Sequence, residues 1–171
     1  MKKVILLVVT GAVLISLVAG SAVMASGKSH SELYLYEKDP SNWQIVEDGA
    51  RGRLKYNLEG PEFEFGFNGH GLESCTDYSL IHYDEWATGW PRLIKVIASG
   101  TTNNGGNINL GGSIDLNADL AGPADVYNPD GGAKIWLVLT DDIVGGNLSG
   151  WNPTEYLFEN NLIKYTDTDK T

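Results

Sequence analysis

Apolar and polar residues alternate with a period of two along much of this chain, and this alternation constrains the fold more than any other feature. In EFEFGFN, residues 62–68, phenylalanine occupies every second position, with glutamate or glycine between. RLKYNL, residues 53–58, and NINLGGSIDL, residues 107–116, alternate in the same way. Because successive strand residues point to opposite faces of a sheet, each stretch is predicted to be a strand with one buried face.

Four further stretches are rich in aromatic and β-branched residues and are also predicted to be strands. They are ELYLYE (32–37), DYSLIHY (77–83), LIKVIA (93–98) and KIWLVL (134–139). The last is apolar on both faces, which predicts a central strand. Glycine and proline turns separate the strands, so the sequence predicts an all-β fold: an antiparallel immunoglobulin-like or jelly-roll-like β-sandwich of eight to nine strands. The one helix candidate, residues 152–158, is equally compatible with a turn that leads into an edge strand.

The N-terminus has the layout of a secretory signal peptide. Lys2 and Lys3 precede an apolar run, and Val23-Met24-Ala25 fits a cleavage site. We therefore expect residues 1–25 to be removed and residues 26–171 to form a single β-sandwich domain. The alternative is an uncleaved N-terminal anchor.

Charge and cysteine content exclude several classes of protein. The 171 residues carry a net charge of −10, which argues against nucleic acid or anionic lipid as a partner. The single cysteine, Cys75, excludes a domain held together by internal disulfides. Beyond the predicted signal, no stretch is long and apolar enough to span a bilayer.

GLESCTDYSL, residues 71–80, places Leu72, Thr76 and Tyr78 in the pattern Leu-x-Pro-x-Thr-x-Tyr, with serine where proline is usual. This stretch resembles the tyrosine corner of fibronectin type III and other immunoglobulin-like domains. The resemblance implies that the Tyr78 ring enters the core while its hydroxyl bonds to the backbone a few residues upstream. Ile81 and Tyr83 would then face outward. In fibronectin modules only a final hairpin follows the corner, whereas most of this domain follows it, so the resemblance implies a style of sandwich and not membership of that family.

A broader resemblance covers most of the predicted mature chain. It rests on FNGHGLE, TDYSLIHY, ASGTTNNGGNINLGGSIDL, GAKIWLVLTDD and GWNPTEYLFE. Together these segments resemble a group of small secreted archaeal and bacterial β-sandwich proteins of uncharacterised function. The resemblance implies an exported domain, extracellular or at the cell surface, and it carries no catalytic residues.

Two groups of reactive side chains could support catalysis. Cys75 lies near histidines and Asp77, but it falls within the tight turn of the corner, and a partly exposed free thiol is the preferred interpretation. A hydrolase would use His82, Asp84 and Glu85. Consecutive strand residues point to opposite sides, so a solvated loop is the preferred interpretation of this trio.

Asp115, Asn117 and Asp119 have the one-three-five spacing of a calcium loop. Leu120 and Val126 occupy the positions where such a loop needs glycine and glutamate, which excludes a helix-loop-helix calcium site. A looser calcium site, completed by Asp125 or Asp130, remains an alternative to ordinary loop polarity. No other cofactor is predicted.

The tryptophans fall into two groups. Trp86, Trp90 and Trp151 lie in predicted loops that contain glycine or proline, where flat rings with a polar edge could form a platform for sugars or proteins. The alternative is that they close the ends of the sandwich. Trp43 and Trp136 lie on predicted strands and are expected in the core.

These features predict an exported, non-catalytic domain with a structural or adhesive role at the cell surface or in the extracellular matrix. A glycan- or small-ligand-binding module that uses the loop tryptophans is the alternative, and a hydrolase is a third. Expected partners are cell-envelope or matrix proteins or glycans. Asn147 begins an Asn-Leu-Ser glycosylation sequon. The strand at residues 32–37 is expected to pair within its own sheet, the alternative being self-assembly through a neighbour's edge.

Overall fold

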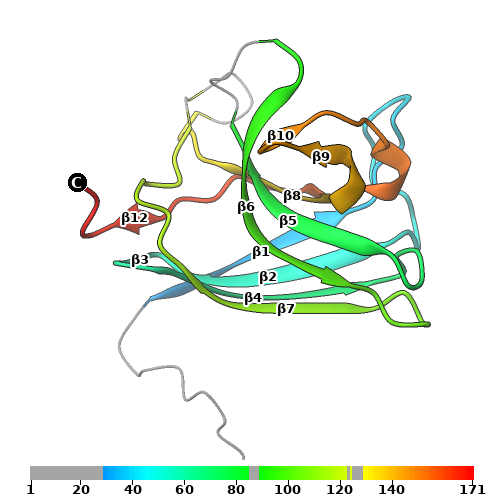
Figure 1. Ribbon diagram of the computed structural model, residues 1–171, viewed down its shortest axis with the longest axis horizontal. Helices are drawn as coiled ribbons and strands as arrows, with labels where there is room; N and C mark the ends of the chain where they lie inside the picture. The colour runs from blue at the N-terminus through cyan, green and yellow to red at the C-terminus, as the bar shows by residue number, and fades with distance from the viewer. Residues whose placement is uncertain (1–28, 85–88, 123, 125–128) are drawn as a thin grey trace, which may run out of the picture.

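Two antiparallel five-stranded sheets pack face to face in the computed structural model, which describes residues 29–84, 89–122, 124 and 129–171 (Figure 1). The predicted signal, residues 1–25, lies outside the described residues. The first sheet has the order β11 (Phe158–Glu159), β1 (His30–Tyr36), β2 (Arg51–Asn57), β4 (Phe63–His70) and β7 (Ile108–Ile114). The second has the order β8 (Lys134–Leu139), β5 (Asp77–Tyr83), β6 (Arg92–Thr101), β10 (Asn147–Leu148) and β9 (Ile143–Val144).

The predicted all-β antiparallel sandwich is confirmed. Twelve strands are described, which exceeds the expected eight to nine. The excess comes from five strands that are only two residues long. One of these, β3 (Glu59–Gly60), pairs in parallel with β12 (Thr166–Asp167). Two short 3₁₀ helices, η1 (Thr140–Asp142) and η2 (Pro153–Glu155), are the helical elements among the described residues. The stretch 152–158 is therefore a turn leading into the edge strand β11.

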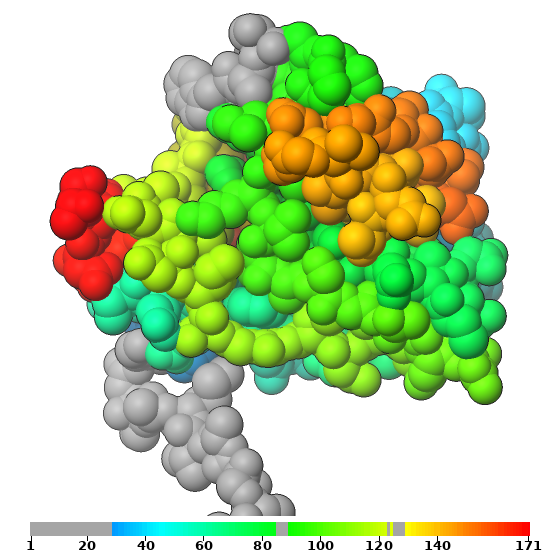
Figure 2. Space-filling view, in the orientation of Figure 1, coloured from blue at the N-terminus to red at the C-terminus, as the bar shows by residue number. Residues whose placement is uncertain are grey.

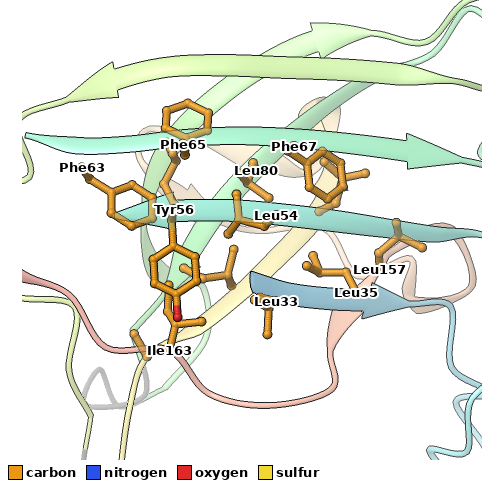
Figure 3. Packing of buried hydrophobic residues seen from close by; sticks show 14 of the residues in the cluster. Leu33, Leu35, Leu54, Tyr56, Phe63, Phe65, Phe67, Leu80, Leu157 and Ile163 are labelled. Atoms are coloured by element: carbon orange, nitrogen blue, oxygen red, sulfur yellow. The ribbon is translucent and has the colours of Figure 1, made fainter. Parts of the chain in front are cut away.

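The main core lies between the sheets and follows from the period-two pattern (Figure 3). The three alternating phenylalanines of β4 are buried, while Glu64 and Gly66 between them are partly exposed to solvent. The facing residues of the second sheet come mainly from β5 and β8, with Ile97 from β6. The largest contributors are Leu33, Leu35, Leu54, Tyr56, Phe63, Phe65, Phe67, Tyr78, Leu80, Ile135 and Leu137.

A second apolar cluster covers the outer face of the second sheet. Ile81, predicted to face outward, is fully buried there with Trp136 and Val138. Tyr83, also predicted to face outward, is only partly exposed and packs on the same cluster. Both side chains lie on the outer face, as predicted, but this face is shielded from solvent because the segment from η1 to β11 folds back over it and adds Leu148, Tyr156 and Phe158.

The first strand of the domain, β1, is held by backbone pairing along its whole length. β1 pairs with β2 over all seven of its residues, and Leu35 and Tyr36 also pair with β11. β1 thus lies inside its own sheet, as expected.

β8 was predicted to be a central strand, but it is last in the order of the second sheet. Both its faces are nevertheless covered, and Leu137 forms a bridge to Leu157. No helix among the described residues has the length and apolarity needed to cross a membrane.

The predicted tyrosine corner joins β4 to β5. Leu72 and Tyr78 are buried in the main core, and the Thr76 hydroxyl donates to the Ser74 carbonyl at 3.0 Å. The Thr102 hydroxyl ties the corner to the β6–β7 connection, since it donates to the Glu73 carbonyl at 2.6 Å.

The Tyr78 hydroxyl departs from the corner pattern. It is sealed from solvent and makes no hydrogen bond of ordinary geometry with any described residue. Burial raises its pKa to about 12; the Glu73 backbone, five residues upstream, interacts with the hydroxyl and opposes this rise. The ring therefore fills its predicted place, whereas the expected hydrogen bond is not formed.

The two buried tyrosines of this end of the sandwich should respond differently to loss of the hydroxyl. Tyr78→Phe should change the free energy of unfolding by less than about 0.5 kcal/mol, because no hydrogen bond is lost. Tyr156→Phe should cost about 1–3 kcal/mol, because the Tyr156 hydroxyl donates to the buried Asp142 carboxylate at 2.5 Å. Urea unfolding measures both. A loss of 1 kcal/mol or more from Tyr78→Phe would show that the corner hydrogen bond exists in solution.

Candidate functional site

Aromatic rings from four separate segments meet at one edge of the second apolar cluster. We define the aromatic surface by its four outer rings, Trp43, Tyr83, Trp90 and Trp151. Trp151 is the central ring, with centroids 6.1 Å from Trp90 and 6.3 Å from Trp43. Beneath it lie Trp136, Tyr156 and Phe158, at 6.2, 5.7 and 6.3 Å.

These outer rings are unusually open to solvent for tryptophan. Trp43 and Trp90 are each 50% exposed and Trp151 is 44% exposed. Figure 2 shows the segment of residues 140–155, in orange, lying against the loop of residues 37–50, in cyan, and near the start of β6, in green. Large exposed aromatic groups that touch one another mark a site of interaction more often than isolated ones do.

A buried carboxylate fixes the loop that carries Trp151. The Asp142 side chain accepts two hydrogen bonds from the Asn152 amide, at 2.9 and 3.0 Å, and one from the Tyr156 hydroxyl. The Asp142 carbonyl accepts the backbone N–H groups of Ser149 and Gly150. A side chain at Gly150 would collide with the Asp142 carboxylate, so glycine is required there. Trp151 therefore sits between anchored neighbours.

The loop that carries Trp43 is also tightly bonded. The Asp39 carbonyl accepts the Trp43 N–H at 2.7 Å, and the Asp39 carboxylate accepts the Ser41 N–H at 2.8 Å. Hydrogen bonding by the Ser41 side chain, followed by that of the Ser41 backbone, lowers the pKa of Asp39. Trp43 has a φ of 59°, a conformation that is strained for a bulky side chain and is more common at functional sites.

The structure changes the sequence-based division of the tryptophans. Trp90 and Trp151 come together as a platform would require, and Trp136 is buried as expected. Trp43 was expected in the core and is exposed instead, because it lies in the loop between β1 and β2. The preceding Pro40-Ser41-Asn42 was the available signal for a loop. Trp86 lies outside the described residues.

An open pocket of about 360 Å³ lies on the aromatic surface, lined by Tyr83, Trp90 and Trp151. Ligand pockets commonly have volumes of roughly 300–1,000 Å³ and aromatic walls. The Tyr83 ring stacks on Trp136 with centroids 4.0 Å apart, and the Arg92 guanidinium lies 5.5 Å from the Tyr83 centroid on a cation–π contact. The pocket therefore has a rigid apolar floor and a cation near its border.

Glu159 lies behind this surface and is partly exposed as a residue, but its Oε2 atom is sealed from solvent. Burial raises the pKa of its carboxyl to about 7, while the nearby cations of Lys134 and Lys38 and the Trp136 indole oppose the rise. Neither Glu159 Oε2 nor Trp136 Nε1 makes a hydrogen bond of ordinary geometry with a described residue. The Lys38 ammonium donates to the Glu159 backbone carbonyl at 2.8 Å.

A cysteine–histidine site at the corner would need Cys75, His70 and Asp77 to bond one another. Each of the three instead bonds a different partner. Cys75 Sγ donates to the side-chain amide oxygen of Asn104, Oδ1, at 3.0 Å, and His70 Nδ1 lies 2.8 Å from Asn107 Oδ1. Asp77 accepts a hydrogen bond from Thr101. Each residue is thus bonded to the β6–β7 connection or the strands beside it.

The hydrolase trio is only partly described, because Glu85 lies outside the described residues. His82 and Asp84 border a cavity of about 10 Å³, which is smaller than any substrate. Burial is the main reason that the pKa of His82 is lowered. The charge of Asp84 opposes this shift, and the charge of Lys95 adds to it.

Asp115, Asn117 and Asp119 are each bonded to protein groups. Asp115 accepts the Asn117 N–H at 2.7 Å, and Asn117 itself has a φ of 50°. Asp119 accepts the Asp167 N–H at 2.9 Å and pairs with Lys170. No three metal-binding side chains converge among the described residues, which include Asp130 but not Asp125. Calcium binding stays a prediction.

Asn147, the sequon residue, lies in β10 and is partly exposed. Its side-chain amide donates to the Gly145 carbonyl at 3.1 Å. Glycosylation there also stays a prediction.

The chain matches no protein-family model, no curated protein and no solved structure.

Glu159 should make stability depend on pH. Its folded pKa of about 7 exceeds its ordinary value of 4.5, so between these values the folded state binds more protons than the unfolded state. Its contribution to stability is therefore present below about pH 4.5 and is lost as the pH rises through 7. Relative to the wild type, Glu159→Gln should gain up to roughly 3 kcal/mol at pH 8 and nothing at pH 4. Urea unfolding at both values measures this. An equal gain at both would contradict the burial of this carboxyl.

Proposed function

We propose that this protein is an exported, non-catalytic adhesive domain that binds carbohydrate through the aromatic surface. The observation that carries the proposal is the contact of three half-exposed tryptophans from distant segments, with Trp151 at the centre. A sugar ring offers an apolar face and polar edges, and an indole ring matches it with a flat apolar face and a polar N–H.

The rigidity of the surface supports binding. Trp151 lies beside residues anchored by Asp142, and the Trp43 loop is closed by its own backbone hydrogen bonds. A surface that is already ordered loses less conformational entropy when it binds a ligand. Export rests on the predicted signal peptide, and partners in the cell envelope or matrix follow from export and adhesion.

Two other functions receive less support. A hydrolase at His82 and Asp84 would need a substrate cleft, and the described residues leave only a very small cavity there. Assembly through β1 would need that strand to leave a sheet in which Leu33 and Leu35 are buried.

Tryptophan fluorescence tests the proposal directly. The wild-type domain should respond to at least one member of a panel of soluble oligosaccharides that includes cellohexaose, chitohexaose and mannan oligomers. Trp151→Ala should weaken that binding by roughly ten-fold or more, since one stacked ring commonly contributes over 1 kcal/mol. Trp90→Ala should weaken it as well.

Tyr34→Ala is the matched control, because Tyr34 is a 41% exposed aromatic residue on the outer face of the first sheet. It should leave binding unchanged. Thermal unfolding of each variant checks that the fold is intact. The proposal fails if a folded Trp151→Ala variant binds as tightly as the wild type, or if no oligosaccharide changes the fluorescence.

A further inference from the structure

The three tryptophans of the aromatic surface lie in three different planes. The planes of Trp90 and Trp151 are nearly perpendicular, at 85°, and those of Trp43 and Trp151 are inclined at 47°. Because Trp43 and Trp90 make different angles with Trp151, they are not parallel to each other either. The three half-exposed indoles therefore offer no common flat face.

The buried rings beneath hold this inclined arrangement. Trp151 meets Tyr156 at 5.7 Å between centroids and 87° between planes, and Trp43 meets Phe158 at 5.3 Å and 83°. Both partners are buried, and edge-to-face contact is one of the arrangements that aromatic pairs prefer. Turning Trp43 or Trp151 towards a common plane would disrupt the contact beneath it. The inclination is thus set by the packing of the covering segment.

The inclination also gives the pocket on this surface its shape. Trp90, Trp151 and Tyr83 line its volume of about 360 Å³. Two flat rings set nearly at right angles, as Trp90 and Trp151 are, form a corner. A corner can contact a ligand on two sides at once, whereas coplanar rings contact one face only.

This shape discriminates between the physical forms of a polysaccharide. A sugar that stacks on an aromatic ring lies with its apolar face against that ring. Chains packed in a crystal present their sugars in one flat face, so several rings can stack on that face together only if the rings are coplanar. A single chain in solution is free of its neighbours and can place different sugars, or two sides of one sugar, against inclined rings.

On the basis of the carbohydrate-binding function proposed above, we infer that the aromatic surface recognises single, solvated polysaccharide chains and rejects the flat face of a crystalline polysaccharide. Trp90 and Trp151 hold the chain in the corner between them, and Trp43 contacts its continuation beyond the pocket. An exported adhesive domain of this kind would attach to hydrated matrix or envelope glycans.

The same sugar in different physical forms tests this selectivity. Cellohexaose, chitohexaose and mannohexaose are titrated by tryptophan fluorescence, and sedimentation measures retention by the corresponding amorphous and highly crystalline polymers. At least one hexamer should bind the wild type, and its amorphous polymer should retain it. A variant that combines Trp90→Ala with Trp151→Ala should bind that hexamer at least roughly ten-fold more weakly. The crystalline polymer should retain no more wild-type protein than this double variant.

Tyr34→Ala, on the outer face of the first sheet, is the matched control and should behave as the wild type does in every assay. Thermal unfolding checks that each variant is folded. Retention of the wild type by a crystalline polymer above the level of the double variant would overturn the inference and leave carbohydrate binding intact. So would failure of the amorphous polymer to retain a protein that binds its hexamer. If no hexamer binds and no polymer retains the protein, the carbohydrate function itself fails and the inference fails with it.

Discussion

The apolar outer face of the second sheet is the constraint on which the rest of the structure depends. Ile81, Trp136 and Val138 point away from the main core, and water cannot be left against them without a large loss of hydrophobic stabilisation. The segment from η1 to β11 supplies the cover, and Leu148, Tyr156 and Phe158 are its buried residues. The same segment carries Trp151, so covering this face also places the central ring of the aromatic surface.

A covering segment made of short strands and loops needs internal bonds to hold one shape, and Asp142 provides them. Its buried carboxylate and carbonyl accept hydrogen bonds from both sides of Trp151. Such a network is strong because the interior has a low dielectric constant and every donor has an acceptor. The exposed rings thus rest on a bonded frame, which favours recognition of a ligand by a surface formed in advance.

The sequence predicts the main core well and the site only in part. The alternation of Phe63, Phe65 and Phe67 identifies buried positions because strand geometry alone decides which residues share a face. Strand alternation also places Ile81 on the outer face of its sheet. Alternation cannot predict that the segment from η1 to β11, much later in the chain, covers that face. Trp90 and Trp151 could be assigned to loops, whereas their contact depends on long-range folding. The exposure of Trp43 follows from its position in the loop between β1 and β2, and the turn residues Pro40-Ser41-Asn42 are the local signal that argues against a strand there.

The most direct measurement of the central claim is an NMR titration of the tryptophan indole N–H signals with an oligosaccharide. The chain has five tryptophans, which gives few enough indole signals to assign by substitution. The account predicts large shifts for Trp43, Trp90 and Trp151 and a smaller one for the buried Trp136. Saturation with a bound oligosaccharide that leaves those three signals unmoved, or that shifts only backbone signals on the outer face of the first sheet, would contradict it.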